Sequence, residues 1–203
     1  MGLMAKLKRA GMRAIGKEPP AMFIQTEQTP NPATLKFIPG RAVMKSGTLD
    51  CPSPESAKQS PLAERLFGID GVSGVFLGSD FITVTKSGGV EWQTIKPRVL
   101  GAIMDHLLSG FPVVAVPASS AGANAEDDEI VVQIKELLET RVRPAVAQDG
   151  GDIVFERFED GVVYVHLQGS CQGCPSSTAT LKSGIENMLR HYVPEVVEVR
   201  AVH

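Results

Sequence analysis

The sequence predicts an α+β protein built from two small domains. Its 203 residues suffice for one large domain or two small ones. Both halves of the chain combine short strand-like runs with amphipathic helical patterns. Between them, residues 112–126 run through Ala, Ser, Gly and Asn without hydrophobic periodicity, which is typical of a linker. We therefore expect domains at residues 22–111 and 127–203, joined by this linker.

The first domain begins with two short strands at residues 23–26 and 35–38, separated by the turn TPNP. Proline, serine and glycine are frequent in residues 41–59, so this segment is expected to be irregular. Ser60 followed by Pro61 predicts a short helix that ends at Gly68. Two strands and one longer helix complete the unit, at residues 72–77, 81–86 and 91–108.

The second domain has the predicted order α-β-β-α-β. Its first helix spans residues 127–143, and Pro144 and the Gly150–Gly151 pair are expected to break the chain after it. Asp160–Gly161 is a strong signal for a hairpin turn between the next two strands. The remaining elements are strands at residues 153–158 and 162–167, a helix at 176–192 and a strand at 196–202.

Charge and cysteine usage exclude several classes of protein. Residues 1–21 carry five basic residues and one acid, which predicts a poorly ordered basic extension, with organelle targeting as the alternative. From Glu126 onward there are fourteen acids and seven bases, so a basic face for nucleic acid is not expected. The sequence contains no apolar run long enough to span a membrane. Three cysteines without a secretory signal indicate a reducing compartment.

The motif HLQGSCQGCPSST holds Cys171 and Cys174, the candidate ligands of a metal or cluster. Cys171 lies in the turn that leaves a strand, and Cys174 comes just before Pro175, which suits the first turn of a helix. The helix dipole is expected to lower the pKa of the thiols and to favour thiolates. Gly169 and Gly173 allow the backbone to approach a bound group closely.

Several interpretations of this cysteine pair compete. The two cysteines could be incidental, or form a thioredoxin-like redox pair, although a hairpin precedes them where a βαβ crossover is wanted. Zinc or an iron–sulfur cluster normally requires four protein ligands, and one copy of this motif supplies two. A second copy of the chain across a twofold axis would supply the rest.

Other residues of the same chain are weaker candidates for the missing ligands. His166 is more typical of a surface or packing position, and Cys51 of a loop or a partly buried thiol. His191 and His203 lie too far along the next helix and strand. Asp149 and Asp152 flank glycines and are expected to shape the backbone by side-chain hydrogen bonds, in preference to a catalytic carboxylate pair. We find no catalytic residue and expect no enzyme.

Long stretches of the chain resemble a known family. The run from DDEIVVQIKELLETRVRPAVAQDGGD to SCQGCPSSTATLKSGIENMLRHYVPEV is similar to the NifU C-terminal (Nfu) domain. MFIQTEQTPNPATLKFIPG and SPLAERLFGIDGVSGVFLGSDFITVTK resemble the N-terminal domain of two-domain Nfu proteins. The resemblance covers nearly all of the chain from Met22.

This resemblance implies an iron–sulfur cluster carrier. It implies a [4Fe-4S] cluster bound between two subunits by Cys171 and Cys174 of each chain and passed to apo-proteins; four thiolates also suit [2Fe-2S]. The expected partners are apo client proteins, an upstream assembly scaffold and a second copy of the chain. The expected localisation is the cytoplasm of a bacterium, or the mitochondrial matrix of a eukaryote. The N-terminal domain is expected to recognise clients or partners.

Overall fold

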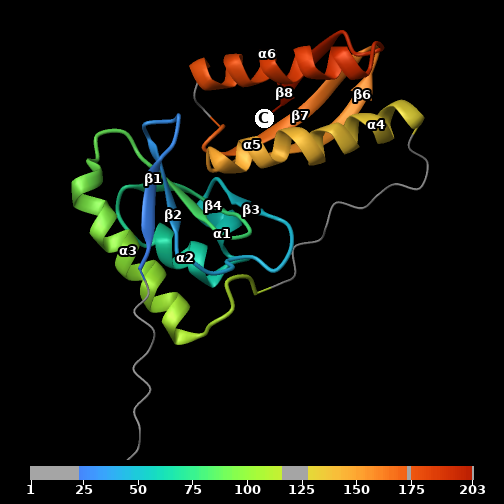
Figure 1. Ribbon diagram of the computed structural model, residues 1–203. Helices are drawn as coiled ribbons and strands as arrows, with labels where there is room; N and C mark the ends of the chain where they lie inside the picture. Colours follow the sequence, from blue (N-terminus) through green and yellow to red (C-terminus); the bar gives the residue numbers. More distant parts are fainter. Residues whose placement is uncertain (1–22, 116–127, 173–174, 203) are drawn as a thin grey trace, which may run out of the picture.

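The computed structural model describes residues 23–115, 128–172 and 175–202. It confirms an α+β fold with two sheets (Figure 1). The N-terminal unit holds a five-stranded antiparallel sheet in the order β1-β2-β5-β4-β3. These strands are β1 (Gln25–Gln28), β2 (Thr34–Ile38), β3 (Leu49–Cys51), β4 (Val72–Leu77) and β5 (Ile82–Lys86).

Three helices cover one face of this sheet. They are α1 (Pro54–Ala57), α2 (Pro61–Phe67) and α3 (Trp92–Ser109). The predicted start of α2 is confirmed, because the Ser60 hydroxyl accepts a hydrogen bond from the Ala63 amide at 3.1 Å. α3 ends where Gly110 adopts a left-handed conformation. The buried side of α3 packs against the sheet through Ile95, Val99, Ile103 and Leu107.

The expectation of an irregular segment at residues 41–59 is wrong in part, because β3 and α1 lie within it. β3 is an edge strand that pairs with β4, with Cys51 opposite Val75. α1 begins at a capping box in which Ser53 and Ser56 bond each other's backbone amides. Pairing with a distant strand therefore outweighs the local Pro, Ser and Gly content.

The C-terminal unit has the predicted order of helices and strands. Its three-stranded sheet has the order β6-β7-β8, with β8 parallel to β7. The helices pack on one face of the sheet and share one apolar core with it, which includes Ile134, Val165 and Leu189. The elements are α4 (Glu129–Leu137), η1 (Leu138–Val142), α5 (Arg143–Gln148), β6 (Gly151–Glu159), β7 (Val162–Gly169), α6 (Pro175–Tyr192) and β8 (Glu198–Val202).

Pro144 does not end the first helix of this unit, which corrects the sequence prediction. A regular α-helix would lose one hydrogen bond at this proline and would bring its ring against the preceding turn. The chain instead forms the π-helical segment η1, in which the Arg143 amide bonds the Leu138 carbonyl. This wider turn places Pro144 in the first turn of α5, so the helical path continues to Gln148.

The hairpin between β6 and β7 is confirmed. Asp160 and Gly161 both have positive φ, 50° and 77°, as the favoured two-residue turn requires. The predicted extension 1–21 and most of the linker 112–126 lie outside the described residues, and the domain boundaries stay a prediction. Within the part of the chain that is described, no helix has the length and apolar character needed to cross a bilayer.

Candidate functional site

The cysteine loop follows β7, as predicted. Gly169 ends the strand with φ +65°, and a Cβ there would lie 2.7 Å from the Gly150 carbonyl oxygen. The Gln172 amide bonds the Gly169 carbonyl at 3.1 Å and closes a tight turn around Cys171. Cys174 lies outside the described residues, and α6 begins directly after it, at Pro175.

The QDGGD motif packs directly against this loop. A Cβ at Gly151 would lie 2.6 Å from the Gln168 carbonyl oxygen and 2.8 Å from the Cys171 sulfur. The Ser170 hydroxyl donates to the Asp149 carbonyl at 2.5 Å, and the Ser170 amide donates to the Gly150 carbonyl at 3.2 Å. Two motifs that lie about twenty residues apart in the sequence thus form one tightly packed site.

Cys171 is 7% exposed, and its sulfur belongs to the apolar core of the C-terminal unit. Burial raises the pKa of this thiol to about 11; the Ser170 hydroxyl lowers it, while the carboxylates of Asp149 and Asp152 raise it further. The expectation of a lowered thiol pKa is therefore wrong for Cys171 in this conformation. The physical reason is desolvation, which disfavours the thiolate.

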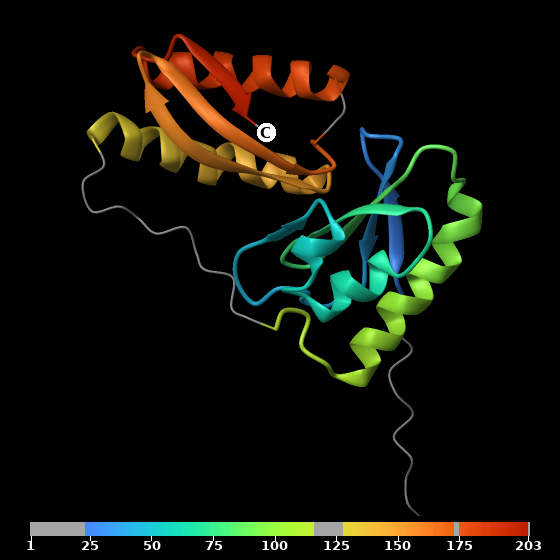
Figure 2. The ribbon, with the colours of Figure 1, turned by 180° about the vertical axis from the view of Figure 1, so that it is seen from behind.

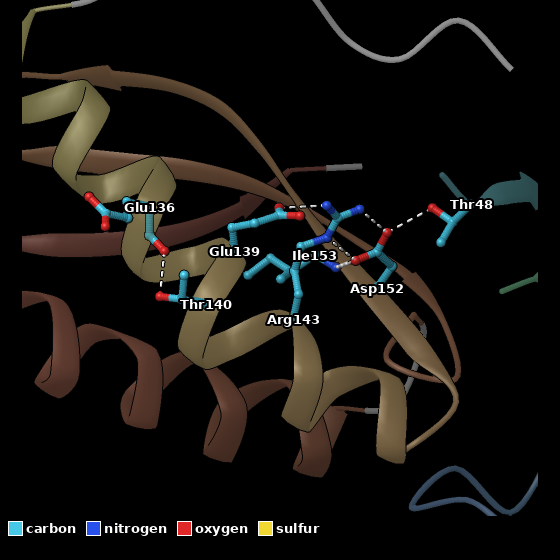
Figure 3. A network of polar contacts seen from close by, with 7 residues as sticks. All are labelled: Thr48, Glu136, Glu139, Thr140, Arg143, Asp152 and Ile153. Carbon is cyan, nitrogen blue, oxygen red and sulfur yellow. Dashed lines mark hydrogen bonds and ion pairs between the residues drawn. The ribbon is translucent and has the colours of Figure 1, made fainter. Parts of the chain in front are cut away.

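An ion-pair network lies beside the loop (Figure 3). Arg143 binds both carboxylate oxygens of Asp152 at 2.8 Å and one oxygen of Glu139 at 2.6 Å. The Thr48 hydroxyl reaches Asp152 from the N-terminal unit at 2.7 Å. Burial alone would raise the pKa of Asp152, but the bonds from Arg143 and Thr48 bring it below its ordinary value.

This network explains the role of Asp152, one of the two acidic residues of the QDGGD motif. Asp152 also accepts the amide of Ile153 at 2.8 Å, so its side chain shapes the start of β6 as predicted. Asp149 contributes its backbone carbonyl to Ser170. With both Asp152 oxygens engaged, this carboxylate is placed for a structural role rather than for proton transfer.

The weaker candidate ligands lie apart from the loop or outside the described residues. His166 Nε2 lies 3.1 Å from a carboxylate oxygen of Glu156 on the open side of the sheet. Cys51 is fully buried in the N-terminal core, in a strand instead of the expected loop, and its pKa is raised to about 11, chiefly by burial. The His191 ring lies edge-to-face against Tyr192, and His203 is not described. Over residues 23–115, 128–172 and 175–202, no three His, Cys, Asp or Glu residues form a metal-binding group.

Sequence reasoning missed the contribution of the N-terminal unit to this site. The Asn31 side-chain amide donates to the Gln172 carbonyl at 3.3 Å, beside Cys171. The Thr83 hydroxyl donates to the Gly150 carbonyl at 2.7 Å. Asn31 lies in the TPNP turn between β1 and β2. For Thr83, the signal in the sequence is the alternation of polar and apolar residues in β5, which marks a polar face without naming what covers it.

Two family descriptions match this chain. The family described as "Scaffold protein Nfu/NifU N terminal" matches residues 24–110. The "NifU-like domain" family matches residues 134–200, which include the cysteine loop and the QDGGD motif.

Curated relatives cover most of the chain. A human protein named "NFU1 iron-sulfur cluster scaffold homolog, mitochondrial" is 54% identical over 184 residues, which are 89% of this chain and 72% of the human protein. "NifU-like protein 4, mitochondrial" of Arabidopsis thaliana is 53% identical over 90% of this chain and 66% of its own length. The chain thus spans about two thirds of the length of these relatives.

Among solved structures, the solution NMR structure of a NifU-like protein from Saccharomyces cerevisiae aligns with a TM-score of 0.41 and 27% identity. The alignment covers 46% of this chain and 85% of that one. At this TM-score the structural likeness adds nothing to the sequence matches.

Proposed function

The chain belongs to the Nfu/NifU family of iron–sulfur cluster scaffold proteins, and from this premise we propose that two copies of it share one [4Fe-4S] cluster. Cys171 and Cys174 of each copy are the proposed ligands. The cluster is cargo, which the protein passes to apo-proteins. As a scaffold, the protein is a carrier and not an enzyme.

The arrangement of the cysteines is the observation that supports a shared cluster. Of the three cysteines, two belong to the loop, and Cys51 is buried in the core of the N-terminal unit. One chain therefore offers two thiolates to a cluster that needs four ligands. A second copy, related by a twofold axis, provides the other two through the same two cysteines, so no other kind of ligand is needed.

The environment of Cys171 favours a carrier over a thiol–disulfide oxidoreductase. A redox-active cysteine needs an exposed sulfur and a depressed pKa. Cys171 is instead buried, and its pKa is raised to about 11. Iron stabilises the thiolate form that the apolar site disfavours, because binding to iron displaces the thiol proton.

Release to a client requires only ligand exchange at iron. Each client thiolate forms a bond to iron as one carrier thiolate leaves, so no electron is transferred and the cluster charge is conserved. The departing Cys171 sulfur then returns to its buried position in the apolar core of the C-terminal unit.

Partners and location follow from the same proposal. We propose apo iron–sulfur proteins as recipients and an upstream assembly scaffold as donor. The human and Arabidopsis relatives are both named mitochondrial, which favours the mitochondrial matrix over the bacterial cytoplasm for this chain.

Anaerobic reconstitution with iron and sulfide tests the shared cluster. We expect about four irons per dimer, and conversion back to monomer when a chelator removes the iron. Cys171→Ser and Cys174→Ser should each abolish the cluster and the dimer. Cys51→Ser is the matched control and should retain both, because its sulfur is buried in the core of the N-terminal unit and donates to the Ser56 carbonyl there.

Other results would change or refute the proposal. Two irons per dimer would keep the shared site and replace the cluster type with [2Fe-2S]. An iron-loaded monomer would refute sharing between copies. Catalytic disulfide reduction without any cluster would favour the oxidoreductase.

A further inference from the structure

Four residues form one row across the N-terminal sheet. Lys36 of β2 lies opposite Thr83 of β5, Thr83 opposite Phe76 of β4, and Phe76 opposite Asp50 of β3. Side chains alternate between the two faces of a strand, so this docking row faces away from the helices. The next residues along the same strands, among them Phe37, Ile82, Val75 and Cys51, point into the N-terminal core.

Every member of the docking row contacts the C-terminal unit. The Lys36 ammonium donates to the carbonyls of Ala147 and Gln148, both at 2.9 Å, and Thr83 donates to Gly150. The Asp50 carboxyl lies beside the backbone amide of Gly169, which partly offsets the rise in its pKa that burial causes. The Phe76 ring lies so close to Gly169 that a Cβ there would approach it to 3.0 Å.

These contacts fall on the two backbone segments that build the candidate cluster site. One segment is the end of α5 and the QDGGD motif, and the other is the loop that carries Cys171. Two residues outside the row contact the same two segments. The Asn31 side-chain amide donates to the Gln172 carbonyl, and the Thr48 hydroxyl donates to the Asp152 carboxylate. The N-terminal unit therefore covers one side of the cysteine loop; Figure 2 shows the two units side by side at this end of β7.

The interface is both specific and separable. Lys36, Thr83 and Asn31 are at most 8% exposed, and the bonds of Lys36 and Thr83 to the C-terminal unit give their buried polar atoms partners. Most of the contacts are hydrogen bonds to backbone carbonyls, which water can replace at small net cost when the units part. Interfaces of this polar kind between units of one chain commonly permit relative motion.

We propose that the N-terminal unit is an intramolecular cap on the cysteine loop, and that its docking row competes with the second subunit that completes the cluster site. This inference rests on the proposed function. A bridging cluster needs the partner's loop within ligand distance of Cys171, but here Gln172, the next residue, is held by Asn31 of the N-terminal unit. Uncapping must therefore precede or accompany cluster-bridged dimerisation.

The competition has a quantitative consequence. When only a fraction of the chains is uncapped, the apparent affinity of one subunit for another falls by that fraction. Weakening the docking row should then make dimerisation tighter, although the substituted residue touches neither the cluster nor the partner. A purely structural role for the row predicts the opposite.

Thr83→Glu in the full chain tests the cap. The new carboxylate faces the Gly150 carbonyl, which repels it, while Lys36 lies opposite on the neighbouring strand and can pair with it once the units separate. Thr85→Glu is the matched control, on the same strand and the same face. Thr85 lies outside the row and bonds Thr34 within the N-terminal unit.

Two measurements read out docking and loading separately. Before reconstitution, ¹⁵N relaxation should show one rotational correlation time for both sheets in the wild type and in Thr85→Glu, and shorter, separate times in Thr83→Glu. After reconstitution, analytical ultracentrifugation under anaerobic conditions should show a dimer dissociation constant about tenfold lower for Thr83→Glu.

Each outcome decides the proposal. Independent tumbling of the two sheets in the wild type would overturn the proposed cap. The proposal would also be overturned if Thr83→Glu separates the two units and the dimer dissociation constant stays the same or rises. If the wild type and both variants fail to bind a cluster, the proposed function is refuted, and so is the role of the cap in controlling cluster binding. The relaxation data would still report docking, so the two failures are distinguishable.

Discussion

Gly151 lies at the closest contact between the QDGGD motif and the cysteine loop. Its φ is not in the left-handed region, so the requirement for glycine is steric: any Cβ would meet the Gln168 carbonyl and the Cys171 sulfur at less than 3.0 Å. The sequence marked this pair of glycines only as a chain break. Their role in packing against Cys171 depends on a strand pairing that the local sequence does not specify.

Gly151→Ala should therefore destabilise the C-terminal unit and displace Cys171. We expect a loss of about 1–3 kcal/mol in the free energy of unfolding, because overpacking forces the loop away from β6. Gly184→Ala is the control: Gly184 lies in α6 with nothing within 4 Å of a new Cβ, and should gain about 0.5–1 kcal/mol. Urea unfolding measures both, and equal stability of the two variants would contradict the steric account.

At the scale of elements, Arg143 ties the start of α5 to the start of β6. Its position depends on η1, because the π-helical turn lets the helix continue past Pro144 and carry the guanidinium to Asp152. The sequence predicted a helix end here because proline normally breaks an α-helix. It contained no sign that a π turn would relieve the clash, since such turns depend on what the helix packs against.

Arg143→Met should cost about 2–4 kcal/mol in the free energy of unfolding, because it leaves the Asp152 carboxylate, only 5% exposed, without its cation. Asp152→Asn in the same background should recover part of this loss by removing the unpaired charge. Arg157→Met is the control, since its partners Glu156 and Glu159 are exposed, and it should cost less than about 1 kcal/mol. Chemical denaturation of these three variants and the wild type measures these differences, and a double variant no more stable than Arg143→Met would argue against a charge effect.

At the scale of the whole molecule, the contact between the two units brings Asp50 against the backbone of Gly169. Burial raises the pKa of Asp50 to about 6 from 3.8, although the Gly169 amide lowers it in part. A raised carboxyl pKa stabilises the fold at acidic pH, and this contribution is lost as the pH rises through about 6. The charged form of Asp50 therefore destabilises the folded protein at neutral pH.

Asp50→Asn should remove this pH dependence, because the asparagine side chain has the same shape and does not titrate. Relative to the wild type, the variant should gain up to roughly 3 kcal/mol between pH 4 and pH 7.5, the equivalent of about two pKa units. Urea unfolding at both pH values measures the difference. A difference that is constant with pH would show that Asp50 is not desolvated in the folded protein.

The sequence by itself determined the α+β class, most of the helices and strands, the helix start at Ser60, the turn at Asp160–Gly161, and the choice of Cys171 and Cys174 as candidate ligands. These features depend on residues close together in the chain, where periodicity, caps and spacing act. Only the tertiary structure decided that β3 forms, that the helix passes Pro144, that Cys171 is buried, and that the N-terminal unit covers the cysteine loop. Each of these results from contacts between distant segments, whose desolvation and hydrogen bonds outweigh local preference.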